Sequence, residues 1–195
     1  GNDYITEKVG GYEFMISANS FFQTNTQQAT KLYNIILEEA SLTGSEIVYD
    51  LFCGTGSISL YISTHAKMVY GFEISMSAVQ DAMQNAINNK VKNAWFFAGD
   101  LKDLFRNNLE AKNLEMPDVM ILDPPRSGLH PQTIEDILEK LPKRIVYVSC
   151  NPATQARDSK ELCKKKYSLV KLRPVDMFPH TPHVENVATL IRNQS

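Results

Sequence analysis

Cys150 lies in the segment SCNPATQARD (149–158), directly after the apolar run 144–148 and directly before Asn151 and Pro152. A cysteine there is open to three roles: a small buried residue, a metal ligand or a nucleophile. Asn151 can cap a helix whose first turn suits Pro152. The thiol would then lie at the positive end of the helix dipole, which favours the thiolate. A single cysteine at a strand end is more often a small buried residue, so the chemistry around it has to decide.

A glycine turn follows an apolar run in DLFCGTGSISL (50–60), where Gly54 and Gly56 permit a tight turn and close approach of the backbone to a ligand. A dinucleotide fingerprint would have a third glycine where this chain has Ser59. The pair of glycines alone is also compatible with an ordinary turn between strand and helix. The missing third glycine fits a ligand without a pyrophosphate, S-adenosylmethionine, better than NAD.

Carboxylates end the next apolar runs. Glu73 lies nineteen residues after Gly54, where its carboxylate can accept hydrogen bonds from both ribose hydroxyls, and Asp100 is placed for an adenine amino group. Each could instead solvate a strand end or cap a helix. As an ordered set after successive strands, they predict a cofactor site, because ligands of open α/β sheets bind beyond the carboxyl ends of the strands.

Asp123 begins the motif DPPRSG (123–128), in which two prolines make the turn rigid and restrict the residue before them. A rigid turn suits a carboxylate that must not move. A related motif with an aromatic residue after the prolines is familiar from amino-group methyltransferases. Arg126 stands in that place here, which weakens the amino-methylation interpretation.

Short apolar runs alternate with amphipathic stretches along most of the chain, which predicts a doubly wound, Rossmann-like α/β fold with a mostly parallel sheet. Strands are expected over 47–52, 68–73, 94–98, 118–123, 144–149, 167–175 and 184–191. Helices are expected over 25–40, 57–65, 77–89, 101–112, 131–140 and 153–165. The last two strands lack a helix between them and predict an antiparallel edge hairpin. A short N-terminal hairpin should turn at Gly10–Gly11, before a helix capped by Asn25 or Thr26.

The composition is that of one soluble domain: 195 residues, 43% hydrophobic and 22% charged. No apolar run approaches the roughly 20 residues that span a bilayer. The three cysteines, Cys53, Cys150 and Cys163, form no CxxC pair, which argues against a disulfide framework, a zinc ribbon or an iron–sulfur cluster in this segment. We therefore expect a reducing, cytoplasmic setting, with Cys53 and Cys163 as packing residues.

Charge is distributed unevenly. The segment 140–173 holds ten Lys/Arg and two Asp/Glu, a net +8, while the rest of the chain carries ten basic and twenty acidic residues, a net −10. A basic third around Cys150 suits a polyanionic substrate. A solvated, lysine-rich helix face is an equally good explanation.

Seven motifs together resemble the RNA 5-methyluridine methyltransferases, which methylate carbon 5 of uracil in ribosomal or transfer RNA. They cover essentially the whole chain in family order: FFQTN (21–25), DLFCGTG (50–56), FE (72–73), GD (99–100), DPPRSG (123–128), SCNP (149–152) and FPHTPHVE (178–185). The resemblance implies that 1–195 is an S-adenosylmethionine-dependent catalytic domain, with 1–24 as a hairpin and lead-in. It also implies a longer protein with an N-terminal RNA-binding part, often an OB-like domain and sometimes an iron–sulfur cluster.

The resemblance also implies residue roles. Asp123 would lie near the methyl-donor and uracil pockets, Cys150 would be the nucleophile and Glu185 the base that removes a proton. The cofactor, whose product is S-adenosylhomocysteine, would be bound by Gln23, Phe52, Gly54, Glu73, Asp100 and Asp123. One departure is Ser57, where many members have Asn; the shorter side chain would lose or reroute one cofactor contact.

Carbon 5 of uracil is too weak a nucleophile to take a methyl group unaided. Addition of the Cys150 thiolate to carbon 6 makes carbon 5 reactive, and Glu185 would then remove the carbon-5 proton so that the cysteine can leave. The base must be unstacked, so we expect RNA loops or flipped-out nucleotides as substrates, ribosomal RNA more than transfer RNA. Phe178 is a candidate for stacking on a base, and packing in the core is an equally good explanation for it.

The segment HTPHVE also resembles a metal cluster, with His180, His183 and Glu185 close in sequence. Pro179 and Pro182 disturb the local geometry and a fourth ligand is missing, so we expect no metal. The histidines would instead shape the uracil pocket or bind phosphate.

Two other functions stay open. A methyltransferase that modifies an amino group through Asp123–Pro124–Pro125 predicts that Cys150→Ser keeps activity. A non-catalytic module predicts binding of S-adenosylmethionine without a covalent RNA adduct. For the chain by itself we expect cofactor binding to persist and RNA affinity to fall sharply.

Overall fold

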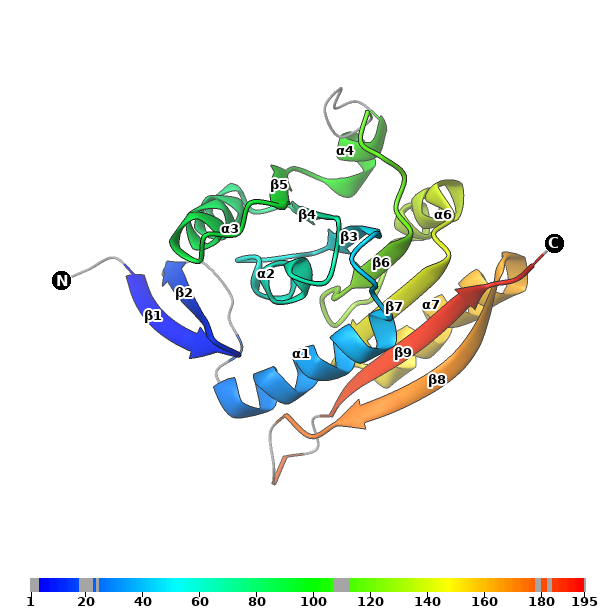
Figure 1. Cartoon of the computed structure of the whole chain (residues 1–195). Helices are drawn as coiled ribbons and strands as arrows, with labels where there is room; N and C mark the ends of the chain where they lie inside the picture. The colour runs from blue at the N-terminus through cyan, green and yellow to red at the C-terminus, as the bar shows by residue number, and fades with distance from the viewer. Residues whose placement is uncertain are drawn as a thin grey trace.

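The structure, a computed structural model, describes residues 4–17, 23, 25–106, 113–177, 180–181 and 184–194. A seven-stranded sheet runs through the molecule in the order β5-β4-β3-β6-β7-β9-β8 (Figure 1). Its strands are β3 (Ile47–Leu51), β4 (Met68–Glu73), β5 (Ala94–Ala98), β6 (Val119–Leu122), β7 (Arg144–Ser149), β8 (Tyr167–Val175) and β9 (Glu185–Arg192). The first five of these are parallel, while β9 pairs antiparallel with both β7 and β8. The predicted parallel sheet with an antiparallel edge hairpin is confirmed.

Helices follow most strands, as the sequence predicts. All six begin within one residue of the expected position, and all but α4 end within two residues of it. They are α1 (Thr26–Ala40), α2 (Ser57–Ser63), α3 (Met76–Asn88), α4 (Leu101–Arg106), α6 (Pro131–Lys140) and α7 (Pro152–Lys165). The helix expected over 101–112 is described only as α4, since 107–112 lie outside the described residues. Asn25 is the N-cap of α1, where its side chain accepts a hydrogen bond from the Gln28 amide. None of the described helices is long and apolar enough to cross a membrane.

Both faces of the sheet are covered, which explains why β3 is buried at every residue. Successive strand residues point to opposite faces, so Val48 packs in one core and Tyr49 in the other. The first core joins α1, α2, α3 and the N-terminal hairpin, and the second joins α4, α6 and α7. Alternate side chains of each of these short strands therefore pack into two different cores.

The N-terminal hairpin consists of β1 (Tyr4–Val9) and β2 (Tyr12–Ser17) and turns at Gly10 and Gly11, both with positive φ. It lies beside α3 (Figure 1), whose polar side chains bind the backbone of β2. The Asn85 side chain accepts from the Met15 amide (2.7 Å) and donates to the Met15 carbonyl (3.0 Å). One turn on, Asn89 makes the same pair of bonds with Glu13, and one turn earlier Asp81 accepts from the Ser17 amide.

Asn85 is fully buried, and its Nδ2 also donates to the Thr55 carbonyl in the glycine turn after β3. Replacing Asn85 by Ala is expected to lower the free energy of unfolding by about 1–3 kcal/mol, because backbone groups of Met15 and Thr55 lose their partner. Urea unfolding measures this. The control is Gln84→Ala on the exposed side of α3, which should change stability by less than about 0.5 kcal/mol. Equal effects of the two substitutions would contradict the structural role of Asn85.

Candidate active site

A cavity of about 1110 Å³ opens at the carboxyl edge of the sheet. It is somewhat larger than the roughly 300–1,000 Å³ of a usual ligand pocket, so it has room for a cofactor and a second group. All eight residues predicted from the sequence line it: Gln23, Phe52, Gly54, Glu73, Asp100, Asp123, Cys150 and Glu185. The structure therefore brings the predicted site together, while the roles of its members stay predictions.

Topology explains the convergence. Chain segments that leave β3, β4, β5, β6 and β7 emerge at the same edge because these strands are parallel. An antiparallel strand begins where its parallel neighbours end, so the first residue of β9, Glu185, lies at this edge too. The pairing of Ser149 with Asn186 brings Glu185 next to Cys150.

The turn after β3 has an unusual backbone. Phe52 has φ 66°, a left-handed conformation that is rare for a residue with a large side chain, and Gly54 and Gly56 also have positive φ. A Cβ on Gly56 would lie 2.9 Å from the Phe96 ring and 3.0 Å from Ala82 Cβ, so only glycine fits there. The Gly54 amide donates to Glu73 Oε2 (3.1 Å). This bond holds the glycine turn against the end of β4.

Glu73 and Asp100 both accept hydrogen bonds from backbone amides near the ends of their strands, which is the alternative role that the sequence left open for them. Glu73 Oε1 accepts from the Ser75 amide (3.0 Å) and Asp100 Oδ1 accepts from the Lys102 amide at the start of α4 (2.9 Å). Both side chains nevertheless line the cavity. Their backbone bonds fix the carboxylates, which leaves further lone pairs for a ligand.

Two serines near the turn have protein partners. Ser59, at the place of the missing third glycine, is buried and donates its hydroxyl to Asp50 Oδ2. The Tyr33 hydroxyl donates to Ser57 Oγ (2.9 Å), so the departure at Ser57 is matched by a contact from α1. Sequence reasoning missed Asp50 and Tyr33. The one signal for Asp50 was a charged residue inside the apolar run 47–52.

Three carboxyl groups in and under the cavity resist ionisation. Burial, followed by the charges of Glu185 and Asp50, raises the pKa of Asp123 to about 8. Burial raises the pKa of Asp50 to about 7 despite its bond from Ser59, with a further contribution from the Glu73 charge. Burial also raises the pKa of Glu185, although the Arg126 charge opposes this. A cationic ligand would relieve this repulsion, so the donor set fits the sulfonium and ammonium groups of S-adenosylmethionine.

Cys150 is half-buried at the end of β7 and lines the cavity. Asn151 is the N-cap of α7, and its side chain accepts from the Ala153 amide (3.1 Å), with Pro152 in the first turn as expected. Gln155 in the same helix donates to the carbonyls of Tyr147 (2.7 Å) and Asn186 (3.0 Å), which ties β7 to β9 beside the thiol.

The other two cysteines lie elsewhere. Cys53 is buried, and burial together with the charges of Asp50 and Glu73 raises the pKa of its thiol. Cys163 is half-buried near the end of α7 and packs against the second core. Neither lines the cavity, which fits the packing role expected for both.

The basic segment 140–173 is less positive in space than in sequence. At least six of its cations form ion pairs: Lys143, Arg157, Lys164, Lys165, Lys171 and Arg173. Several of their partners, among them Glu39 and Asp118, lie outside the segment. The count of +8 therefore overstates the charge offered to a polyanion. Among the described residues, Arg126 and Lys102 are the arginine and lysine that line the cavity.

Within the described residues, no group of three or more His, Cys, Asp or Glu side chains could hold a metal ion. His183 and Phe178, which the sequence singled out, lie outside the described residues. A second hollow of about 470 Å³ lies at the opposite edge of the sheet. Two of its charged residues, Lys143 and Asp118, pair with each other at 2.8 Å, and none of the predicted site residues lines it.

This sheet order and the ligand cavity at the carboxyl edge define a class I S-adenosylmethionine-dependent methyltransferase fold. A tRNA m1G37 methyltransferase from M. jannaschii shares the fold, with a TM-score of 0.70 at 15% identity, over 100% of this chain and 58% of that one. A Pyrococcus abyssi tRNA (uracil-54, C5)-methyltransferase, solved with S-adenosyl-L-homocysteine, has a TM-score of 0.83 at 37% identity. That match covers 98% of this chain and 45% of that chain.

The family model tRNA (Uracil-5-)-methyltransferase matches residues 1–193, and the chain belongs to this family. An uncharacterized RNA methyltransferase from Porphyromonas gingivalis is 51% identical over 194 residues, 99% of this chain and 42% of the relative. One from Staphylococcus aureus is 47% identical over 188 residues, 96% of this chain and 41% of the relative. The chain thus spans about two-fifths of the length of these relatives.

The raised pKa of Asp123 predicts a stability cost. Between about pH 4 and about pH 8 the carboxyl ionises more readily in the unfolded chain, so it lowers folding stability as pH rises. Asp123→Asn removes this effect. We expect its Tm to exceed that of the unaltered protein by several °C near pH 8 and the gain to vanish near pH 4. Thermal unfolding followed at several pH values measures this.

Asp118 gives a control of opposite sign. Burial alone would raise its pKa, but the bonds from Lys143 and the Ile47 amide outweigh burial and lower it. Its ionised form therefore stabilises the fold above the ordinary pKa of an aspartate, and this stability is lost as pH falls through the lowered value. Asp118→Asn should lower the Tm near pH 8. A drop for both variants would contradict the electrostatic account of Asp123.

Proposed function

We propose that this chain is the catalytic domain of an enzyme that methylates carbon 5 of uracil in RNA, with Cys150 as nucleophile and Glu185 as base. The observation that carries the proposal is the shared cavity, in which a half-buried thiol and a buried carboxylate adjoin the carboxylates at the ends of β4 and β5. Family membership supports the same reaction. So does the similarity to the Pyrococcus abyssi enzyme, which is named as a uracil C5 methyltransferase.

S-adenosylmethionine would supply the electrophilic methyl group. In our proposal, Glu73 accepts hydrogen bonds from the ribose hydroxyls and Asp100 from the adenine amino group. The fixed backbone bonds of both carboxylates hold them ready for these contacts. Gln23, Phe52 and Gly54 line the same cavity and complete the binding site. Asp123 lines the cavity together with these expected cofactor-binding residues and with Cys150.

The thiolate of Cys150 adds to carbon 6 of uracil, and the electron pair of the 5,6 double bond moves into an enolate. Carbon 5 would then take the methyl group of S-adenosylmethionine, whose sulfonium–methyl bond breaks to leave S-adenosylhomocysteine. This divides one difficult step into easier ones. Helix α7 begins directly after Cys150 and Asn151, so the thiol lies at the N-terminal end of this helix.

Glu185 removes the carbon-5 proton, and the electron pair of that C–H bond restores the double bond as the thiolate leaves carbon 6. Its burial and raised pKa suit this task, since a base works best when its pKa approaches the working pH. The charge of Arg126 opposes the rise in the pKa of Glu185. Holding thiol and carboxylate in one geometry supplies part of the rate enhancement.

For the RNA we favour transfer RNA. The comparisons give no support to the ribosomal preference expected from the sequence, whereas the family and the Pyrococcus abyssi enzyme are both named for transfer RNA. The target base must leave its stack to enter the cavity, so a loop nucleotide is the expected substrate. The particular uridine follows from no residue of this chain.

Trapping with 5-fluorouridine tRNA tests the reaction. Fluorine cannot leave as a proton, so the unaltered protein with S-adenosylmethionine should retain a covalent RNA adduct on Cys150, seen as a slower band in a denaturing gel. Cys150→Ala should give none, while Cys163→Ala, the half-buried cysteine outside the cavity, should give as much as the unaltered protein. With ordinary uridine, Glu185→Gln should accumulate the adduct, because proton removal is blocked.

The outcomes separate the functions. Methylation that persists in Cys150→Ser would favour amino-group methylation through Asp123. Binding of S-adenosylmethionine without any adduct would favour a non-catalytic module. An adduct that survives Cys150→Ala would overturn the role of this thiol.

A further inference from the structure

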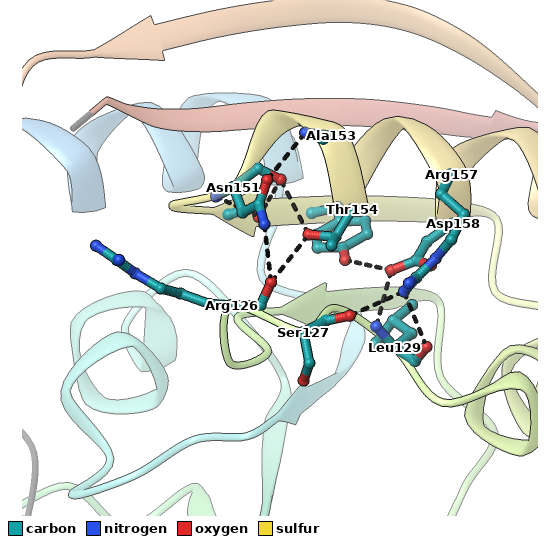
Figure 2. A network of polar contacts seen from close by, with 10 residues as sticks. Arg126, Ser127, Leu129, Asn151, Ala153, Thr154, Arg157 and Asp158 are labelled. Atoms are coloured by element: carbon teal, nitrogen blue, oxygen red, sulfur yellow. Dashed lines mark hydrogen bonds and ion pairs between the residues drawn. The ribbon is translucent and has the colours of Figure 1, made fainter. Parts of the chain in front are cut away.

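The loop that carries DPPRSG lies against the first two turns of α7 (Figure 2). The carbonyl of Arg126 accepts from Asn151 Nδ2 (3.1 Å) and from Thr154 Oγ1 (3.3 Å). The Arg126 side chain extends away from these bonds in Figure 2 and lines the cavity. Helix α7 therefore binds the backbone of the loop at Arg126, while the guanidinium of Arg126 extends away from the helix.

One turn further along α7, Arg157 and Asp158 hold the next part of the loop. Arg157 Nη2 donates to the carbonyl of Ser127 (2.9 Å), and Asp158 Oδ2 accepts from the Leu129 amide (2.8 Å). Arg157 Nε also donates to Asp158 Oδ1 (2.8 Å), and the Tyr147 hydroxyl donates to Asp158 Oδ2 (2.8 Å). We call Asn151, Thr154, Arg157 and Asp158 the α7 clamp.

The α7 clamp is more than a surface contact. Asp158 is 1% exposed, and each of its carboxylate oxygens is paired, through charge-assisted or neutral hydrogen bonds. Loss of a partner would leave a buried charge without compensation, which is costly. Gly128, with φ 77°, lies so close that a Cβ would be 2.5 Å from Asp158 Oδ2 and 2.7 Å from Arg157 Nη2. Loop and helix therefore fit in one arrangement.

The position of this loop matters for the reaction. Its first residue is Asp123, and both Asp123 and Arg126 share the cavity with Cys150 and Glu185. The α7 clamp therefore connects two segments of the site: the loop that begins at Asp123 and the helix that begins just after Cys150. Every hydrogen bond from the α7 clamp to the loop goes to a backbone atom. These bonds fix the position of the loop backbone without using a loop side chain as a partner.

We propose that Arg157 and Asp158 are positioning residues. They hold the 123–128 loop so that the side chains of Asp123 and Arg126 keep a fixed position relative to the Cys150 thiol. They touch the loop backbone and act on the reaction through it. The inference rests on the proposed function for its chemistry and on the α7 clamp for its geometry. It assigns a catalytic contribution to residues that do not line the cavity.

The test compares Arg157→Ala and Arg157→Lys with Lys164→Ala. Arg157→Ala should lower stability but leave the chain folded, because Asp158 keeps its hydrogen bonds from the Leu129 amide and the Tyr147 hydroxyl. Lys164 forms an exposed ion pair with Glu161 on the same helix. At saturating S-adenosylmethionine and 5-fluorouridine tRNA, the rate of adduct formation in Arg157→Ala should fall roughly 100-fold, the effect of a displaced reactive group. Arg157→Lys keeps the charge but loses the fork of donors, and it should recover only part of the rate. Lys164→Ala should react at the normal rate.

Two further readouts separate positioning from general weakening. The Kd for S-adenosylmethionine, measured by calorimetry, should change much less than the rate of adduct formation. Of the expected cofactor contacts only Asp123 lies in the loop, whereas the glycine turn, Glu73 and Asp100 come from other strands. Amide exchange at Leu129, whose N–H donates to Asp158, should accelerate in Arg157→Ala and not in Lys164→Ala. Gly128→Ala keeps all four clamp residues but pushes the loop away from Asp158 and Arg157, so it should reproduce the slow adduct formation.

The results decide between the two claims. If the unaltered protein forms no adduct, the proposed function fails. If it does and Arg157→Ala matches its rate well below the melting temperature, the positioning role is wrong. Unchanged exchange at Leu129 in Arg157→Ala overturns the inference whatever the reaction proves to be.

Discussion

The antiparallel pairing of β9 with β7 is the contact on which the site depends. A parallel strand would begin at the opposite edge of the sheet and carry Glu185 away from Cys150. Because β9 runs the other way, its first residue meets the last residues of β7, and Gln155 bonds both strands at that point. A slip of one residue would turn the side chains of β9 to the opposite face. The register that places Val187 in the first core therefore also sets the face on which Glu185, two residues earlier, lies.

Electrostatics make the same region unfavourable for folding. Asp50, Asp123 and Glu185 each have a raised pKa, chiefly because burial opposes their charge, and neighbouring carboxylates add to the effect at Asp50 and Asp123. In the described residues, Asp50 Oδ1 is buried without a hydrogen-bond partner. Ligands that bind only the folded state offset such a cost by mass action. The buried carboxyl groups lower the stability of the folded chain, a common cost of sites selected for activity. Packing in the two hydrophobic cores offsets this cost.

The sequence predicted the elements well because each strand and helix is encoded locally, by alternating apolar residues and by caps such as Asn25 and Asn151. It predicted the membership of the cavity because parallel strand ends meet at one edge. It missed Asp158 and Asn85, whose partners lie 29 and 70 residues away, and local pattern carries no trace of such pairs. The charge count failed for the same reason: Glu38 and Glu39 neutralise Arg173 from the far end of the chain. A preference between ribosomal and transfer RNA is written in no single residue type.

The contact between α3 and β2 has a geometric consequence. Four residues of an α-helix advance about 6.0 Å, and two residues of a strand advance about 6.6–6.8 Å. Side chains at every fourth helix position can therefore bind every second strand residue, as Asp81, Asn85 and Asn89 do with Ser17, Met15 and Glu13. The helix imitates a neighbouring strand and closes an edge that would otherwise invite another chain. The rise of four helix residues and that of two strand residues differ by about 0.7 Å, and this difference accumulates with each successive contact. Only a few such contacts can therefore form in a row, and β2 is short enough for them.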